Sequence, residues 1–144
     1  MESKDDELLM ETLWALCYLT ELTEFKVEEF VGKPTILKVA DLLMFGKTDK
    51  RTLLLRLIGN FSSGSDSLVD LIIASKVLPF IVKLLSGPEA KGIMEEACFI
   101  FANVAAGNIR HIDELKDLNV FDIVCDYLKR PEIGAKVCST HNHE

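Results

Sequence analysis

The sequence predicts an all-α protein, folded as a right-handed superhelical stack of short helical repeats. Three observations predict this class: a unit that recurs every 42 to 43 residues, helical spacing of the apolar residues within each unit, and few turn-forming residues. Glycine and proline number only 8 and 4 in 144 residues, which argues against an all-β fold with many tight turns. A hydrophobic content of 49% is enough to fill a continuous core.

Equivalent residues form columns when the chain is aligned against itself with this period. The first half of each unit supplies two columns, which are Trp14, Arg56 and Phe99, and Tyr18, Asn60 and Asn103. The second half supplies three apolar columns, which are Ile36, Leu78 and Phe121, then Val39, Ile81 and Val124, then Leu43, Leu85 and Leu128. Periods of about 42 residues are typical of armadillo and HEAT repeats, so each unit is expected to be a set of packed helices.

Within each unit, the spacing and the end signals are those of helices. In residues 77–85 the apolar positions follow the i, i+3, i+4, i+7 pattern of one buried helical face. Pro79 suits the first turn of that helix, and short helices are expected before the second halves, as at 67–74 and 108–115. Gly64 and Gly107 follow two of the core segments, where we expect them to end helices in the left-handed conformation.

The chain is expected to form one armadillo-type domain over residues 1–144. The repeats are predicted at about 8–46, 47–88 and 89–131, with the start of a fourth at 132–144. About three repeats is near the minimum that such a stack needs for stability. No polar cap is recognisable at the C-terminal end, and an uncapped repeat exposes an apolar flank. Self-association through the uncapped ends is therefore expected.

The charge of the chain indicates its partners. The net charge is −7 and the isoelectric point is about 5.0. Nucleic acid and anionic membranes would repel such a chain, so neither is an expected partner, whereas Lys/Arg-rich peptides would be attracted. The N-terminus lacks the features of a signal peptide, and no apolar run approaches the ~18 residues of a membrane span. Four cysteines (Cys17, Cys98, Cys125 and Cys138) form no disulfide framework, which predicts reduced thiols and a cytoplasmic and nuclear location.

The residue order in the first two columns resembles one family. Successive units hold an aromatic or Arg residue and, four positions later, Tyr or Asn, in the pairs Trp14 and Tyr18, Arg56 and Asn60, Phe99 and Asn103. A small-small-Gly-Asn turn follows at 105–108. This order resembles roughly the fifth to eighth armadillo repeats of importin-alpha, the adaptor that binds nuclear localisation signals. The resemblance covers nearly the whole chain after residue 8.

The resemblance implies a site and a function. In the family, the third helices of successive repeats line a concave groove, where Trp rings stack on Lys or Arg stems of a cargo and Asn amides bond to its backbone. Residues four apart on a helix share one face, as this arrangement requires. Carried over, the groove would consist of Trp14, Tyr18, Arg56, Asn60, Phe99 and Asn103, with Glu96 pairing with a cargo base. The implied role is protein import into the nucleus, with basic cargo segments and importin-beta-type transport factors as partners.

Other interpretations of these residues stay open. Trp14 and Tyr18 are also consistent with core aromatics, Asn60 and Asn103 with structural bonds to a neighbouring helix, and Arg56 with a structural ion pair. The second functional hypothesis is accordingly an armadillo scaffold that has lost peptide binding and holds other proteins. The hypotheses differ in the groove, because a binding groove should be open and acidic with Tyr18, Asn60 and Asn103 exposed. A scaffold could bury these side chains or fill the groove.

No catalytic constellation and no cofactor site is recognised. The sequence has no Gly-rich phosphate loop, no nucleophile elbow and no metal-binding pair on one helix, so neither an enzyme nor a cofactor is expected. Cys138, His141 and His143 near the C-terminus do not have the spacing of a zinc site. His111 is expected to lie at the surface, because no catalytic partner is near it in the sequence.

Overall fold

The computed structural model describes residues 3–22 and 26–131. Within these ranges the chain forms eight α-helices, two 3-10 turns and no strand, which confirms the predicted all-α class. The helices are α1 Lys4–Glu21, α2 Lys33–Phe45, α3 Arg51–Ser62, α4 Asp66–Ala74, α5 Val77–Leu85, α6 Ala90–Ala105, α7 Ile109–Asp117 and α8 Val120–Leu128. The 3-10 turns are η1 Val27–Glu29 and η2 Thr48–Lys50.

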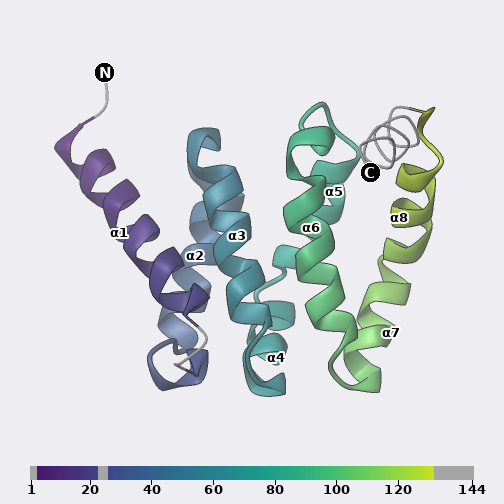
Figure 1. Ribbon diagram of the computed structural model, residues 1–144, viewed down its shortest axis with the longest axis horizontal. Helices are drawn as coiled ribbons and strands as arrows, with labels where there is room; N and C mark the ends of the chain where they lie inside the picture. Colours follow the sequence, from purple (N-terminus) through teal and green to yellow (C-terminus); the bar gives the residue numbers. More distant parts are fainter. Residues whose placement is uncertain (1–2, 23–25, 132–144) are drawn as a thin grey trace, which may run out of the picture.

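The helices are arranged in rows (Figure 1). The helices α1, α3 and α6 lie side by side in one row, with α2 and α5 behind them. The central helix, α3, contacts α1 on one side, α6 on the other and α2 behind. The predicted repeat limits remain a proposal, and the partial fourth repeat at 132–144 lies outside the described residues.

The apolar core is centred on α3. Leu55, Leu57, Ile58 and Phe61 of this helix are fully buried, because neighbouring helices cover it from several sides. Burial of one such side chain stabilises the fold by about 1.5–3 kcal/mol relative to an exposed position. Of the helices α1, α3 and α6, on which the predicted groove residues lie, α3 is therefore the one most firmly held by packing.

The apolar columns of the second halves are buried in the first two units and open in the third. Leu43 of α2 is 1% exposed, whereas its counterpart Leu128 of α8 is 66% exposed. Phe121 is also exposed, although Ile36 and Leu78 in the same column are fully buried. Among the described helices α8 is the last of its row, so no further described unit covers these side chains.

Two polar caps, 43 residues apart, begin the short helices α4 and α7. The hydroxyl of Ser65 accepts a hydrogen bond from the Leu68 amide at 3.4 Å. The side-chain oxygen of Asn108 accepts from the Arg110 and His111 amides at 3.0 and 3.2 Å. A capping side chain satisfies backbone donors that the first turn leaves free. The short helices predicted at 67–74 and 108–115 thus lie within one or two residues of the observed ones.

The prediction of left-handed glycines was wrong. In the described residues no glycine has a positive φ, and the residues directly after α3 and α6, Ser63 and Ala106, are in the right-handed conformation. At both turns a neighbouring side chain instead occupies the space that a Cβ would take. A Cβ at Gly64 would lie 2.7 Å from Leu68 Cδ1, and a Cβ at Gly107 would collide with the ring of His111.

The prediction that His111 lies at the surface was also wrong. Its imidazole is buried, and its Nε2 lies 2.6 Å from Oδ1 of Asp70 on α4. Cys138, His141 and His143 lie outside the described residues. Within residues 3–22 and 26–131, no group of three or more metal-ligating side chains is gathered, and no helix has the length and apolar character that a membrane crossing requires.

Candidate functional site

The seven predicted groove residues project from the three helices of one row. These are Trp14 and Tyr18 on α1, Arg56 and Asn60 on α3, and Glu96, Phe99 and Asn103 on α6. Trp14, Arg56 and Glu96 line one hollow of the surface, and Arg56, Asn60, Glu96 and Phe99 line the next. The structure therefore brings residues from all three repeats together along one surface.

The aromatic residues of α1 are exposed and stacked on each other. The ring centroids of Trp14 and Tyr18 lie 5.7 Å apart with an interplanar angle of 27°, and the two residues are 37% and 62% exposed. An exposed indole face can take up a Lys or Arg side chain through a cation–π interaction. Phe99 is also exposed, and it packs against Gly59, where an added Cβ would lie 2.6 Å from Phe99 Cδ1.

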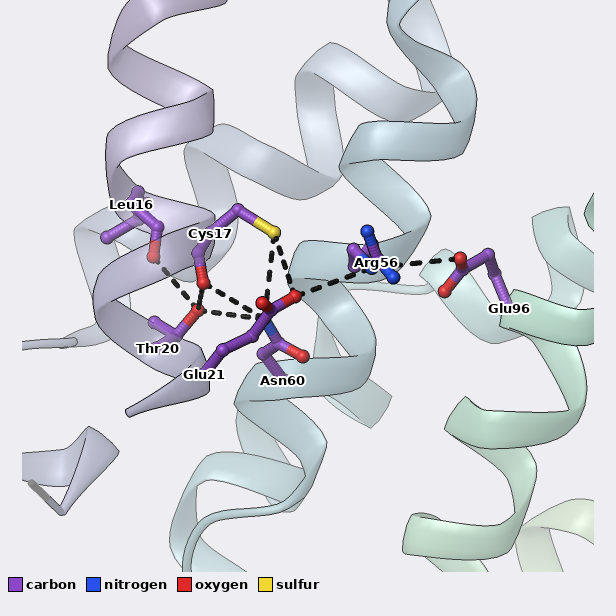
Figure 2. A network of polar contacts seen from close by, with 7 residues as sticks. All are labelled: Leu16, Cys17, Thr20, Glu21, Arg56, Asn60 and Glu96. Atoms are coloured by element: carbon purple, nitrogen blue, oxygen red, sulfur yellow. Dashed lines mark hydrogen bonds and ion pairs between the residues drawn. The ribbon is translucent and has the colours of Figure 1, made fainter. Parts of the chain in front are cut away.

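Asn60 is turned toward the helix before it. Its residue is only 7% exposed, and its amide nitrogen donates to Thr20 Oγ1 at 2.9 Å and to the Cys17 carbonyl at 3.4 Å. Figure 2 shows this amide nitrogen directed at α1, while the amide oxygen points away from it. The NH2 group thus joins α3 to α1. The amide oxygen takes no part in these bonds, and Asn60 also lines two of the surface hollows.

Asn103 repeats this arrangement one unit later. It is half-buried, and its amide nitrogen donates to the Gly59 carbonyl at 3.1 Å and to Ser62 Oγ at 3.2 Å. The bond joins α6 to α3 in the same way that Asn60 joins α3 to α1. Because a buried amide needs a partner, this column ties neighbouring repeats together whatever else it does.

Arg56 stands between two acidic residues from the helices on either side. Its Nε lies 3.4 Å from Oε1 of Glu21 on α1 and 3.9 Å from Oε1 of Glu96 on α6 (Figure 2). The side chain of Arg56 is 48% exposed, so these ion pairs are partly screened by solvent. Arg56 therefore both reaches solvent and pairs with acids.

Sequence comparison relates the chain to one group of curated proteins. Importin subunit alpha-1a of Oryza sativa subsp. japonica is 32% identical over 108 residues, which are 75% of this chain and 20% of that protein. Importin subunit alpha-7 of Arabidopsis thaliana is 36% identical over 95 residues, which are 66% of this chain and 18% of that protein. The chain thus spans about a fifth of the length of these relatives. No protein-family model matches it.

Solved structures share the fold of this chain, and one of them is a designed armadillo repeat protein. A designed armadillo repeat protein in complex with the peptide (KR)4 superposes with a TM-score of 0.76 at 18% identity, over 93% of this chain and 56% of that one. An engineered protein from a structural genomics consortium superposes with a TM-score of 0.75 at 21% identity, over 90% and 52%. The chain is an armadillo-repeat protein related to the importin alpha subunits.

The surface hollows along α1, α3 and α6, which we call the armadillo groove, are open and acidic. Two adjoining hollows of 650 and 450 Å³ share Glu21, Asn60 and Phe99, and a third of 200 Å³ extends the second toward Trp14. The charged residues that line the three hollows are five acids, Glu21, Glu28, Asp49, Glu95 and Glu96, and two bases, Lys26 and Arg56. This local excess of negative charge favours a cationic ligand.

Burial perturbs two titratable groups beside this groove. Desolvation raises the pKa of the Glu96 carboxyl above its ordinary value, and the nearby Arg56 guanidinium opposes that rise. Burial, and then the hydrogen bond to Glu21, raise the pKa of the Cys17 thiol to about 11. An approaching cation would therefore stabilise the charged form of the Glu96 carboxylate. Cys17 remains a neutral thiol near neutral pH.

Three residues of α1 that act in or beside the groove, Glu21, Thr20 and Cys17, were not predicted from the sequence. A signal for Glu21 was present, because it follows Trp14 by seven residues and therefore shares its helical face. Thr20 and Cys17 act as acceptors for an amide 40 and 43 residues away, and nothing in the local sequence announces that contact.

Proposed function

We propose that this chain binds Lys/Arg-rich segments of partner proteins along the groove formed by α1, α3 and α6. The observation that carries the proposal is the acidic surface, in which Glu21, Glu95 and Glu96 line one hollow and Glu96 lines the next hollow together with the exposed Trp14. Carboxylates pair with the charged ends of basic side chains, while an indole face packs on their stems. The two kinds of group together favour Lys and Arg over other side chains.

The ligand backbone has fewer partners in this proposal than the family resemblance implies. The NH2 groups of Asn60 and Asn103 donate to neighbouring helices, so only their amide oxygens remain to accept hydrogen bonds from a peptide. A net hydrogen bond contributes only about 0.5–1.5 kcal/mol, and here it serves mainly to orient the ligand. Binding is therefore expected to depend on charge and to weaken with salt.

Two comparisons support this assignment. The designed armadillo repeat protein with the same fold is in complex with an alternating Lys-Arg peptide, (KR)4. The curated relatives are importin alpha subunits. We therefore propose that the bound segments are nuclear localisation signals, that the chain acts without catalysis as an adaptor in protein import, and that it occurs in cytoplasm and nucleus. Importin-beta-type factors are the further partners that this role requires.

The scaffold hypothesis remains the second candidate, and one observation favours it. Asn60 is buried against α1, and Arg56 occupies part of the acidic surface, so the row is partly closed by its own side chains. A scaffold would use such bonds to fix the spacing of its repeats and would bind partners elsewhere. The two candidates differ in whether Trp14 contributes to peptide affinity.

The predicted self-association also has a structural counterpart. An apolar hollow of 250 Å³ lies beside Phe121 and Val124, whose counterparts in the earlier units are buried inside the stack. A second copy that packed its first unit there would continue the internal contact between repeats. Sedimentation velocity at several concentrations tests this prediction, because a strictly monomeric chain would contradict it.

The binding proposal is tested by fluorescence polarisation of a labelled (KR)4 peptide at low and at physiological salt. We expect saturable binding that Trp14→Ala weakens about two- to five-fold, since an exposed cation–π contact is worth ~0.5–1 kcal/mol. Phe45→Ala is the matched control, because Phe45 is an exposed aromatic at the end of α2 and lines none of the groove hollows. Equal affinities for Trp14→Ala and Phe45→Ala would favour the scaffold.

A further inference from the structure

We propose that Arg56 is a specificity-determining residue that competes, from within the groove, with the basic side chains of a ligand for Glu21 and Glu96. This inference rests on the proposed peptide-binding function and deepens it. It implies an effect opposite to that of an ordinary contact residue. Removal of Arg56 would strengthen the binding of a Lys/Arg-rich peptide, because the two carboxylates would lose their internal partner.

The geometry places Arg56 where a ligand cation would pair. Its Nε lies 3.4 Å from Glu21 and 3.9 Å from Glu96, so one guanidinium spans the acids of α1 and α6. Figure 2 shows the three side chains in line, with Arg56 of α3 between Glu21 of α1 and Glu96 of α6. A Lys or Arg side chain of a ligand that approached either carboxylate would meet the like charge of Arg56.

Arg56 can move while the carboxylates stay in place. Its neighbours Leu55 and Leu57 are fully buried, which fixes the backbone of α3, but the Arg56 side chain is half exposed and free to turn into solvent. Glu21 is also held by the Cys17 thiol, which donates to it at 3.4 Å. Glu96 is anchored on α6 with a side chain only 18% exposed. Displacement of Arg56 thus leaves a formed pair of acceptors.

The column position explains why a cation here matters. Arg56 occupies the register of Trp14 and Phe99, so the row presents a ring, a guanidinium and a ring in successive repeats. Apart from Lys26, which lines the hollow at the far end of α1, Arg56 is the only base among the residues that line the three described hollows. Arg56 therefore offsets the negative charge in the middle of the groove, where a basic ligand would otherwise have its most favourable electrostatic interaction.

Four variants test this role, with binding of labelled (KR)4 peptide measured at low salt. Arg56→Gln should tighten binding about two- to five-fold, the range expected when exposed ion pairs with a competitor are removed. Arg56→Lys keeps the charge and should stay near the unmodified chain. Lys116→Gln, an exposed α7 residue outside the groove, controls for the change in net charge. In Arg56→Gln/Glu96→Gln the gain should be lost, because one freed carboxylate is gone.

The outcomes separate the two proposals. Saturable binding that Arg56→Gln weakens, or tightens no more than Lys116→Gln does, would overturn the competitor role while peptide binding stands. Binding that appears only in Arg56→Gln would support the competitor role. Absence of saturable binding in every variant would overturn both proposals. Thermal unfolding of each variant shows whether the fold is kept, so that a loss of binding is not misread.

A spectroscopic readout follows the displacement itself. The Nε–H resonance of Arg56 is assigned in ¹⁵N-labelled protein by its absence from Arg56→Gln. We expect peptide saturation to move this resonance toward the position of a solvated arginine, since Glu21 and Glu96 then pair with the ligand. A resonance that does not change while the peptide binds would contradict displacement, whatever the affinities.

Discussion

The imidazole Nε2 of His111 lies 2.6 Å from the carboxylate Oδ1 of Asp70, joining α7 to α4 across a repeat boundary. The Nδ1 atom of the same ring accepts from the Asn108 amide at 3.4 Å, so Nε2 carries the hydrogen and donates to Asp70. His111 also completes the capping box at the start of α7. The buried imidazole of His111 therefore caps the first turn of α7 and also bonds this helix to α4, the equivalent helix of the preceding repeat.

His111→Ala should lower the free energy of unfolding by about 2 kcal/mol, since it removes a buried hydrogen-bonded side chain and leaves partners unpaired. Asp70→Asn is the matched variant, because the amide oxygen can still accept from Nε2, and its cost should be smaller. Urea denaturation followed by circular dichroism measures both. Equal costs for the two variants would contradict this account of the contact.

Asn60→Ala should destabilise the chain by about 1–3 kcal/mol, because Thr20 Oγ1 and the amide form a bond inside the row. Thr20→Val, which keeps the shape of the side chain, removes the other partner. The double variant should cost less than the sum of the single variants, since both break the same interaction. A double-mutant cycle from chemical denaturation provides the coupling, and strict additivity would argue against the bond.

Two glycines in neighbouring helices should respond to alanine with opposite signs. Gly59→Ala places a Cβ 2.6 Å from Phe99 Cδ1, so the ring or the helix must shift, and we expect a loss of about 1–3 kcal/mol. A Cβ added at Gly92 of α6 would meet no atom within 4 Å. Gly92→Ala should therefore raise the free energy of unfolding by about 0.5–1 kcal/mol, because alanine has the higher helix propensity. Thermal unfolding compares them, and a stabilised Gly59→Ala would show that α3 and α6 are not so close.

Cys17 should resist alkylation near neutral pH while Cys125 reacts. The thiolate is the reactive form, and a pKa raised to about 11 leaves very little of it at pH 8. Cys17 is also buried, whereas Cys125 is exposed. Peptide mapping by mass spectrometry after timed iodoacetamide treatment measures the two rates. Because the pKa is raised, the rate at Cys17 should still rise as the pH increases from 8 to 10, and rapid labelling at pH 8 would contradict its burial.

The sequence allows the fold to be predicted because the first two repeats bury the same positions. Leu43 and Leu85 occupy one column and are both buried, so the period of 42 residues reflects a repeated contact. The terminal member, Leu128, carries the same pattern but is exposed. Periodicity therefore identifies the face of a helix that is suited to burial, and the presence of a neighbouring element decides whether it is covered.

The candidate site was less predictable, since its details depend on contacts between repeats. The spacing of Arg56 and Asn60 places both on one helical face, but it does not say which atoms of Asn60 turn toward α1. Gly64 and Gly107 show the same limit. Their position after a helix suggested a backbone requirement, whereas the structure shows that a side chain, such as His111 beside Gly107, takes the space of a Cβ.

The uneven covering of the row has a consequence for motion. The central helix α3 has packed neighbours on both sides, while α8 leaves Phe121 and Leu128 open to water. In a linear array, an end unit opens at a lower free energy than the middle one, because it gives up a single interface. Amide hydrogens of α8 should accordingly exchange with solvent sooner than those of α3. The acidic surface lies on α1, α3 and α6, so it would remain formed while α8, the last described helix, opens and closes.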